Sequence, residues 1–228
     1  MNISKPLEAI EIETGKSPPT AAVIWMHGLG ADGNDFVPIV PELGLSGAPA
    51  VRFVFPHAPM RPVTINNGYV MRAWYDVSFG DLEGKSRKAD EQGVRNSEAQ
   101  IRALIEREAQ RGVALGRIVL AGFSQGGAIA LQTGLCYPQQ LGGIMALSTY
   151  LPLAAVLAQE ASPANRKTPI FMAHGTYDPV VPYLMGTSSK KTLTTLGYSV
   201  EWREYPMQHS VCAEEVRDIG NWLRNVLK

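Results

Sequence analysis

Short apolar runs alternate with amphipathic stretches along most of this chain. Residues 21–26 are apolar without interruption and include β-branched side chains, which is typical of a strand buried on both faces of a sheet. Residues 51–55 have the same character and stop at Pro56. Further short apolar runs predict strands over 117–121, 143–147 and 169–173.

The amphipathic stretches predict helices between these strands. Residues 90–111 place aliphatic side chains on one helical stripe, with oppositely charged side chains one turn apart on the other side. Residues 125–135 predict an apolar helix, and residues 211–227 repeat aliphatic side chains at spacings of three and four. Alternating strands and helices form βαβ units, which build a mainly parallel sheet with helices on both faces. We therefore predict a single α/β domain over residues 1–228.

Three other segments complete the expected architecture. Residues 8–13 alternate isoleucines with acidic side chains and predict an edge strand with one wet face. Residues 198–202 alternate in the same way and turn Tyr198, Val200 and Trp202 inward. Residues 56–88 contain several prolines and glycines and interrupt the alternation of strands and helices. We therefore expect an irregular insertion that acts as a functional loop or a lid.

Composition narrows the class of protein. The chain has 228 residues, enough to bury one full core, and its 21 basic side chains balance 21 acidic ones. A neutral chain is not drawn over long range to nucleic acid or anionic lipid, so we expect neither as a partner. The longest apolar run, residues 21–26, is far shorter than the ~20 residues that span a bilayer. We expect a cytoplasmic protein with no transmembrane segment and, with two cysteines, no disulfide scaffold.

A glycine-rich turn supplies the candidate nucleophile. Residues 122–126 read Gly-Phe-Ser-Gln-Gly, between the predicted strand 117–121 and the predicted helix 125–135. The pattern G-x-S-x-G in this context forces a sharp turn that presents the serine hydroxyl above the sheet edge. Gly122, Gly126 and Gly127 are small enough for the strand and helix to come close together. The alternative is a plain glycine-rich turn in which Ser124 only caps the helix.

A serine needs a general base, and chain order selects the candidates for it. The chain contains four histidines: His27, His57, His174 and His209. In this strand-turn-helix arrangement the acid and then the histidine follow the serine. The acidic residues between the nucleophile and the last histidine are Glu160, Asp178, Glu201 and Glu204.

Position within the predicted fold decides among these candidates. Asp178 follows the predicted strand 169–173, where an acid from a neighbouring strand end is expected, whereas Glu160 falls in a polar loop region. His209 lies between the last strand and the last helix, which leaves it as the base. For His174 we expect a turn histidine that hydrogen-bonds the backbone near the site.

Acyl transfer also needs donors for the oxyanion, and we expect them from the main chain. One is the N–H of Gln125, directly after the serine, and the other is the N–H of Leu29, in the loop after the strand 21–26. The same loop spells Gly28-x-Gly30-x-x-Gly33, a dinucleotide-binding pattern. That alternative lacks an acidic residue after the next strand to bind a ribose.

Five motifs together resemble a known family. They are His27 to Gly30, Arg72 to Asp76, Gly122 to Gly127, His174 to Asp178, and His209, in this order. They resemble the phospholipase/carboxylesterase family, close to bacterial carboxylesterases and acyl-protein thioesterases, over most of the chain. The resemblance implies an α/β-hydrolase fold without a large cap domain, hydrolysis of carboxylic esters or thioesters without a cofactor, and often a homodimer.

The resemblance also assigns residues. The nucleophile, acid and base of the family match Ser124, Asp178 and His209, and its oxyanion donors match Leu29 and Gln125. The loop 60–76 is more similar to the bacterial esterase branch than to the eukaryotic thioesterase branch.

These observations predict a serine carboxylesterase acting on small or medium-chain esters. The alternatives are an acyl-protein thioesterase, a lysophospholipase, or a hydrolase fold that binds ligands without turnover. No motif typical of a metal site is present, so we expect no metal and no other cofactor. The acyl pocket should be apolar, and the candidates beside the motif loops are Trp74, Leu151, Val180 and Val181.

Overall fold

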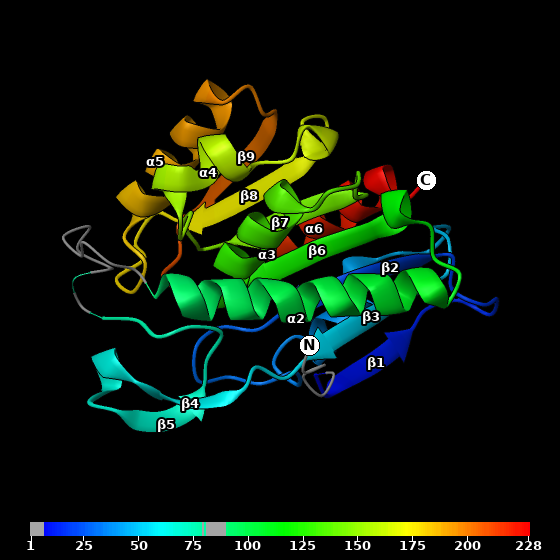
Figure 1. The fold of residues 1–228 in the computed structure, drawn as a ribbon. Helices are drawn as coiled ribbons and strands as arrows, with labels where there is room; N and C mark the ends of the chain where they lie inside the picture. The colour runs from blue at the N-terminus through cyan, green and yellow to red at the C-terminus, as the bar shows by residue number, and fades with distance from the viewer. Residues whose placement is uncertain (1–6, 79, 81–89) are drawn as a thin grey trace.

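A computed structural model describes residues 7–78, 80 and 90–228 of the chain. Its centre is a seven-stranded sheet in the order β1-β3-β2-β6-β7-β8-β9 (Figure 1). Only β1 runs antiparallel to its neighbour, β3. The strands are β1 (Ala9–Glu13), β2 (Ala21–Met26), β3 (Val51–Pro56), β6 (Ile118–Phe123), β7 (Gly143–Leu147), β8 (Ile170–Gly175) and β9 (Val200–Tyr205).

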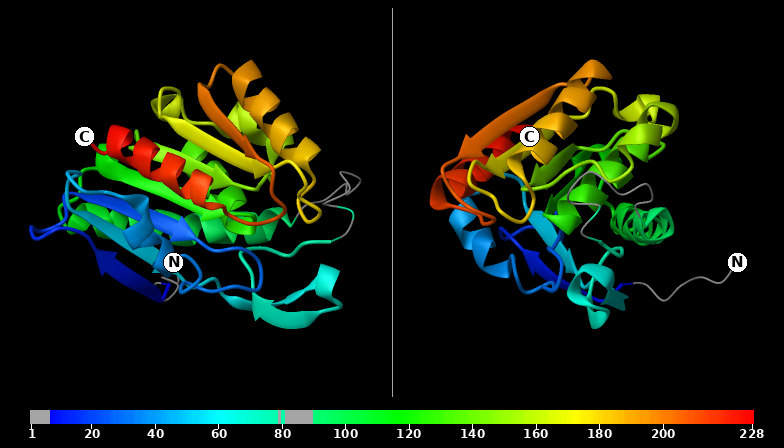
Figure 2. Two further views of the ribbon diagram at one scale, coloured as in Figure 1. Left: turned by 180° about the vertical axis from the view of Figure 1, so that it is seen from behind. Right: turned by 90° about the vertical axis from the view of Figure 1, so that its left-hand side faces the viewer.

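Helices cover both faces of this sheet. They are α2 (Glu91–Gln110), α3 (Gln125–Cys136), α4 (Ala154–Glu160), α5 (Tyr183–Thr195) and α6 (Ala213–Val226), with 3-10 helices η1 (Val37–Leu43), η2 (Thr64–Asn66), η3 (Leu115–Arg117) and η4 (Pro163–Asn165). Figure 2 shows α6 and η1 on one face and α2 and α3 on the other. Two apolar cores follow: α6 and η1 enclose one, and α2 to α5 contribute to the other. The predicted α/β fold with helices on both faces is confirmed.

The predicted strands are all present, with small shifts at their ends. The strand predicted over 21–26 is observed as β2 with the same bounds, and every residue in it is buried. Because both faces of this strand are covered, side chains that point to either face must be apolar. The strand predicted over 198–202 begins later, at Val200, because Tyr198 still belongs to the turn that closes α5 and donates its N–H to Leu193.

Sequence analysis missed several elements. The insertion after β3 contains a hairpin, β4 (Met60–Val63) and β5 (Tyr69–Arg72), and the part of the predicted 56–88 segment at 79 and 81–89 lies outside the described residues. Helix α5 was not predicted because the residues it buries include the small Gly186 and Ser189, which leave no aliphatic stripe. Glu160, expected in a loop, is the last residue of α4 and pairs with Arg95.

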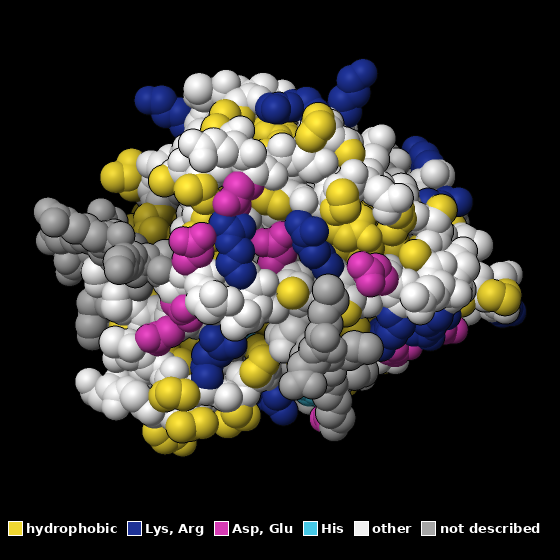
Figure 3. Space-filling model, in the orientation of Figure 1, with side chains coloured by type: hydrophobic (Ala, Val, Ile, Leu, Met, Phe, Trp, Pro, Cys, Tyr) yellow, Lys and Arg dark blue, Asp and Glu magenta, His cyan; other side chains and the backbone are white. Residues whose placement is uncertain are grey.

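The surface agrees with the neutral charge of the chain. Basic and acidic side chains intermingle over the face that carries α2 (Figure 3). Arg95 pairs with Glu160, and Arg102 pairs with Glu98 one turn away. Among the described residues, no helix combines the length and the apolar character that crossing a membrane requires.

Candidate active site

Ser124 occupies a strained turn between β6 and α3. Its backbone has φ +54° and ψ −120°, a conformation that residues other than glycine rarely adopt. The turn is held by the N–H of Ser124, which donates to Leu147 O at 2.8 Å, and by Thr149 Oγ1, which donates to Ser124 O at 2.6 Å. Strain that the surroundings hold in this way is typical of functional sites.

Glycines make this turn sterically feasible. A Cβ on Gly122 would lie 2.3 Å from the carbonyl of Gly126, and one on Gly126 would lie 2.3 Å from the carbonyl oxygen of Met26. Both contacts are with backbone atoms, which cannot rotate away. The small residues that the sequence analysis singled out are therefore required where β6, α3 and β2 meet.

His209 and Asp178 are in direct contact. His209 Nδ1 lies 2.7 Å from Asp178 Oδ2. A carboxylate oxygen can only accept, so Nδ1 carries the proton and a neutral ring keeps the lone pair on Nε2. The side chain of Asp178 is fully buried and that of His209 is 15% exposed. The pair therefore has a buried acid and a base that reaches the surface.

The second oxygen of Asp178 is held by the backbone. The N–H groups of Val180 and Val181 donate to Asp178 Oδ1 at 2.8 and 2.9 Å. Burial raises the pKa of Asp178, but the hydrogen bond and charge of His209, together with these two N–H groups, hold it below its ordinary value. Asp178 is therefore charged at neutral pH and oriented towards His209.

Backbone hydrogen bonds join the segment that carries Asp178 to the segment that carries His209. Thr176 N–H donates to Tyr205 O at 2.9 Å, and Tyr177 N–H donates to Met207 O at 3.1 Å. Gly175 allows this approach, because a Cβ there would lie 2.5 Å or less from the carbonyl oxygens of Met207 and Gln208. The ends of β8 and β9 thus bring together residues that are far apart in the sequence.

The ring of Phe123 places His209 beside the serine turn. The two rings lie 4.7 Å apart between centroids, at an angle of 45°. Because Phe123 directly precedes Ser124, this contact brings the imidazole to the turn that carries the hydroxyl. All three predicted side chains thus belong to segments at the carboxyl ends of β6, β8 and β9.

The loop that carries Leu29 lies against the same turn. A Cβ on Gly28 would lie 3.3 Å from the ring of Phe123 and 3.6 Å from Ser124 Cβ. His27 anchors the loop: its Nδ1–H donates to Gly28 O at 2.7 Å, and its Nε2 accepts from Ala58 N at 3.0 Å. Burial lowers the pKa of His27 to about 4, so the ring stays neutral in this structural role.

Gln125 has a second role that the sequence analysis missed. Its buried side-chain amide accepts from Trp74 N–H at 2.8 Å and donates to Tyr75 O at 2.7 Å. The part of the insertion that follows β5 is thereby held against the first turn of α3. A polar side chain on an otherwise apolar helix was the available signal, but its partner lies fifty residues away in an irregular segment.

The four predicted acyl-pocket residues lie in different environments. Trp74 is completely buried, and its Nε1–H donates to His27 O at 2.9 Å. Leu151 and Val181 are also buried, whereas Val180 is 47% exposed. The indole of Trp74 therefore offers no exposed surface to a substrate here. A pocket lined by these residues stays a prediction.

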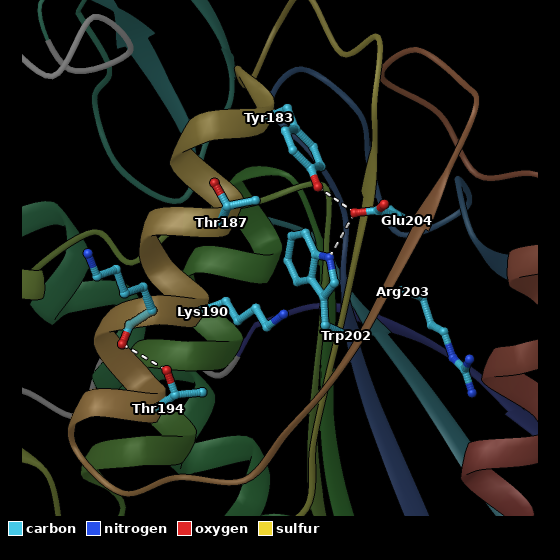
Figure 4. A pocket seen from close by; sticks show the side chains of 8 residues that line it. Tyr183, Thr187, Lys190, Thr194, Trp202, Arg203 and Glu204 are labelled. Carbon is cyan, nitrogen blue, oxygen red and sulfur yellow. Dashed lines mark hydrogen bonds between the residues drawn. The ribbon is translucent and has the colours of Figure 1, made fainter.

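A separate groove of about 690 Å³ lies between α5 and β9 (Figure 4). The residues that line it are Tyr183, Thr187, Lys190, Lys191, Thr194, Trp202, Arg203 and Glu204. None of them is a predicted site residue.

The glycine pattern at residues 28–33 has no nucleotide-binding context. Gly33 N–H donates to His57 Nδ1 at 3.0 Å, and the next helical element, η1, begins only at Val37. A phosphate site of this type needs a helix that starts directly at the glycines. Among the residues that the structure describes, no group of three or more His, Cys, Asp or Glu side chains is arranged to hold a metal ion.

Comparison with known proteins agrees with this fold. The sequence profile of the phospholipase/carboxylesterase family matches residues 7–227. Acyl-protein thioesterase 1 of Neurospora crassa is 42% identical and aligns over 90% of this chain and 86% of its own length. Acyl-protein thioesterase 1 of Yarrowia lipolytica is 37% identical over 98% of this chain and 99% of its own.

Solved structures of similar proteins share this fold. Arabidopsis thaliana SOBER1 superposes with a TM-score of 0.84 and 33% identity, over 91% of this chain and 99% of its own. Zea mays acyl-protein thioesterase 2 has a TM-score of 0.84 and 29% identity, over 97% and 99% of the two chains. Bacillus cereus carboxylesterase, at 17% identity and a TM-score of 0.73 over 99% and 96%, shares the fold.

Proposed function

This chain belongs to the phospholipase/carboxylesterase family, and we propose that it hydrolyses carboxylic esters and thioesters through an acyl-enzyme on Ser124. The observation that carries the proposal is the 2.7 Å hydrogen bond between His209 Nδ1 and Asp178 Oδ2, beside a serine on a strained strand-to-helix turn. An imidazole oriented by a buried carboxylate is the arrangement that activates a serine hydroxyl.

The first half of the reaction forms the acyl-enzyme. His209 Nε2 takes the proton from Ser124 Oγ while Oγ attacks the carbonyl carbon of the substrate. The N–H groups of Leu29 and Gln125 donate to the oxyanion, and Asp178 stabilises the imidazolium. The C–O or C–S bond then breaks, and His209 gives its proton to the departing alkoxide or thiolate.

The second half regenerates the enzyme. Water loses a proton to His209 Nε2 and attacks the acyl carbon, which again places charge on the oxygen facing Leu29 and Gln125. The bond between the acyl carbon and Ser124 Oγ breaks, and His209 returns the proton to Oγ. The products are a carboxylic acid and the free serine, so no cofactor is consumed.

The relatives favour a thioester as a physiological substrate class. The relatives from Neurospora and Yarrowia are named acyl-protein thioesterases at 42% and 37% identity, whereas the bacterial carboxylesterase structure is only 17% identical. Sequence analysis placed the loop 60–76 nearer the bacterial branch. We propose acyl-protein thioesterase activity as the second candidate, beside hydrolysis of small oxygen esters.

The test combines labelling with matched substrates. A fluorophosphonate probe should add its mass to Ser124, and Ser124→Ala should lower kcat by about 10⁴- to 10⁶-fold. Ser46→Ala, at an exposed position, is the control and should leave both readouts unchanged. Oxygen esters and thioesters of the same acyl group, in a series of rising chain length, then compare the two substrate classes. Folded protein with an unlabelled Ser124 and no Ser124-dependent turnover overturns the proposal in favour of a binding module.

A further inference from the structure

His174 is a buried imidazole that no step of the proposed reaction uses. It lies on β8, four residues before Asp178, and is 0% exposed. Its Nε2 lies 2.9 Å from Val181 O, and because a carbonyl oxygen only accepts, Nε2 carries the proton. This contact is the backbone hydrogen bond that sequence analysis expected, although His174 belongs to the strand and not to a turn.

Val181 links this imidazole to the catalytic acid. The carbonyl of Val181 accepts from His174, and its N–H donates to Asp178 Oδ1 at 2.9 Å. The residue is thus held on both sides of its Cα. A displacement of Val181 would move the donor that fixes Oδ1, and with it the direction in which Oδ2 faces His209.

His174 is kept neutral. Burial lowers its pKa and outweighs the opposing charge of Asp178, whose Oδ2 lies 3.5 Å from Nε2. Its Nδ1 meets no hydrogen-bond donor within the described part of the chain and abuts Gly186 of α5, where a Cβ would lie 2.4 Å away. A charged ring here would compete with His209 for Asp178, so a neutral ring leaves the full carboxylate charge to the base.

Two aromatic side chains separate His174 from solvent. Trp202 stacks on its ring at 6.3 Å and 21°, and Tyr183 packs edge-on at 6.0 Å. The Tyr183 hydroxyl and Trp202 Nε1 both donate to Glu204 Oε2 at the wall of the α5–β9 groove (Figure 4). This layer, with Lys190 over the face of Trp202, shields the hydrogen bond between His174 and Val181.

We propose that His174 is a positioning residue: its Nε2–H fixes the turn 178–181, so that the backbone occupies one oxygen of Asp178 and the other faces His209. The inference rests on the proposed function for its kinetic readout, and on the contacts of His174 for its structural one. His174→Gln keeps an amide N–H near the position of Nε2, whereas His174→Leu removes the donor at similar volume. Leu193→Ala, on the buried face of α5, the helix whose Gly186 packs against His174, is the control for general destabilisation.

The kinetic readout separates positioning from folding. His174→Leu should lower kcat by about 10- to 100-fold with little change in KM, since a small misplacement of a catalytic group costs that much. The acid limb of its pH profile should move to lower pH, because an imidazolium with a poorer anionic partner loses its proton more readily. His174→Gln should stay close to wild type, and Leu193→Ala should lower Tm without moving the acid limb.

A spectroscopic readout does not need turnover. The NMR resonance of the His209 Nδ1–H, which reports its hydrogen bond to Asp178 Oδ2, should weaken or move upfield in His174→Leu. If wild type has no esterase activity, the proposed function fails, yet this resonance still tests the positioning role. A folded His174→Leu variant in which the His209 Nδ1–H resonance is as in wild type overturns the inference, as does a His174→Gln variant as impaired as His174→Leu.

Discussion

The main-chain N–H of Trp74 donates to Gln125 Oε1 across 2.8 Å, which ties the part of the insertion that follows β5 to the residue after Ser124. The same amide donates to Tyr75 O at 2.7 Å. The side chain of Gln125 therefore hydrogen-bonds two backbone groups of the insertion, while the backbone N–H of Gln125 is the proposed oxyanion donor. These hydrogen bonds join the insertion to the turn that carries Ser124.

Gln125→Ala should destabilise the protein because it removes the acceptor of the buried N–H of Trp74 and the donor to Tyr75 O. Each buried group left without a partner costs about 1–3 kcal/mol. Urea unfolding measures the change. The control is Gln92→Ala, an exposed glutamine of α2 whose amide donates to Asn96 Oδ1. Equal losses in the two variants would contradict the proposed coupling.

Asp178→Asn should abolish most activity without unfolding the chain. An amide NH₂ facing His209 Nδ1 selects the tautomer with the proton on Nε2, and that ring cannot accept a proton from Ser124. A loss of about 10⁴-fold in kcat is expected. Steady-state kinetics and circular dichroism check activity and folding. Asp218→Asn, which still can accept from Tyr205, should keep wild-type kcat; a comparable loss there would point to a nonspecific effect.

Gly126→Ala should disrupt the contact between α3 and the end of β2. Its Cβ would lie 2.3 Å from Met26 O and 2.6 Å from His27 O, so backbone must move, at a cost of about 3 kcal/mol or more. Gly116→Ala is the control, because nothing lies within 4 Å of a Cβ there. Thermal unfolding compares the two. A Gly126→Ala protein with wild-type Tm would refute the close approach.

Glu215 makes stability depend on pH. Burial raises its pKa to about 8, although the N–H of Cys212 opposes the shift. A carboxyl group with a raised folded pKa binds a proton that the unfolded chain releases, so its favourable contribution is complete below about pH 4 and declines up to pH 8. The slope in that window is at most about 1.4 kcal/mol per pH unit.

Glu215→Gln should remove this dependence. Its free energy of unfolding relative to wild type should rise steadily from pH 5 to pH 8, as measured by urea unfolding at each pH. Glu214→Gln, at the exposed neighbouring position, is the control. Parallel stability curves for Glu215→Gln and wild type would show that Glu215 does not titrate in this window.

The fold was predictable because continuous apolar runs such as β2 can only be strands with two buried faces. Chain order then placed Ser124, Asp178 and His209 each after a predicted strand of one sheet, without any knowledge of distances. The predicted α/β-hydrolase fold is confirmed. The single domain, the homodimer and the cytoplasmic location stay predictions.

What the sequence could not supply were partners fixed only by tertiary packing. A tryptophan in an irregular insertion looks the same whether it lines a pocket or fills the interior, and Trp74 fills the interior. Helix α5 packs through Gly186 against the ring of His174, and the periodicity of hydrophobic residues in the sequence does not predict this contact. The link from His174 through Val181 to Asp178 likewise exists only once β8 and the following turn are folded.

His209, the proposed general base, is carried by the segment that leaves β9, the outermost strand on its side of the sheet, whereas Ser124 follows β6 in the interior. If the proposed roles hold, mild heating that unfolds this edge strand locally would remove His209 from the site while the surroundings of Ser124 stay folded. Activity should therefore be lost at a lower temperature than that of global unfolding. A ligand or a neighbouring molecule that binds at this edge strand would preserve activity more than it raises the melting temperature.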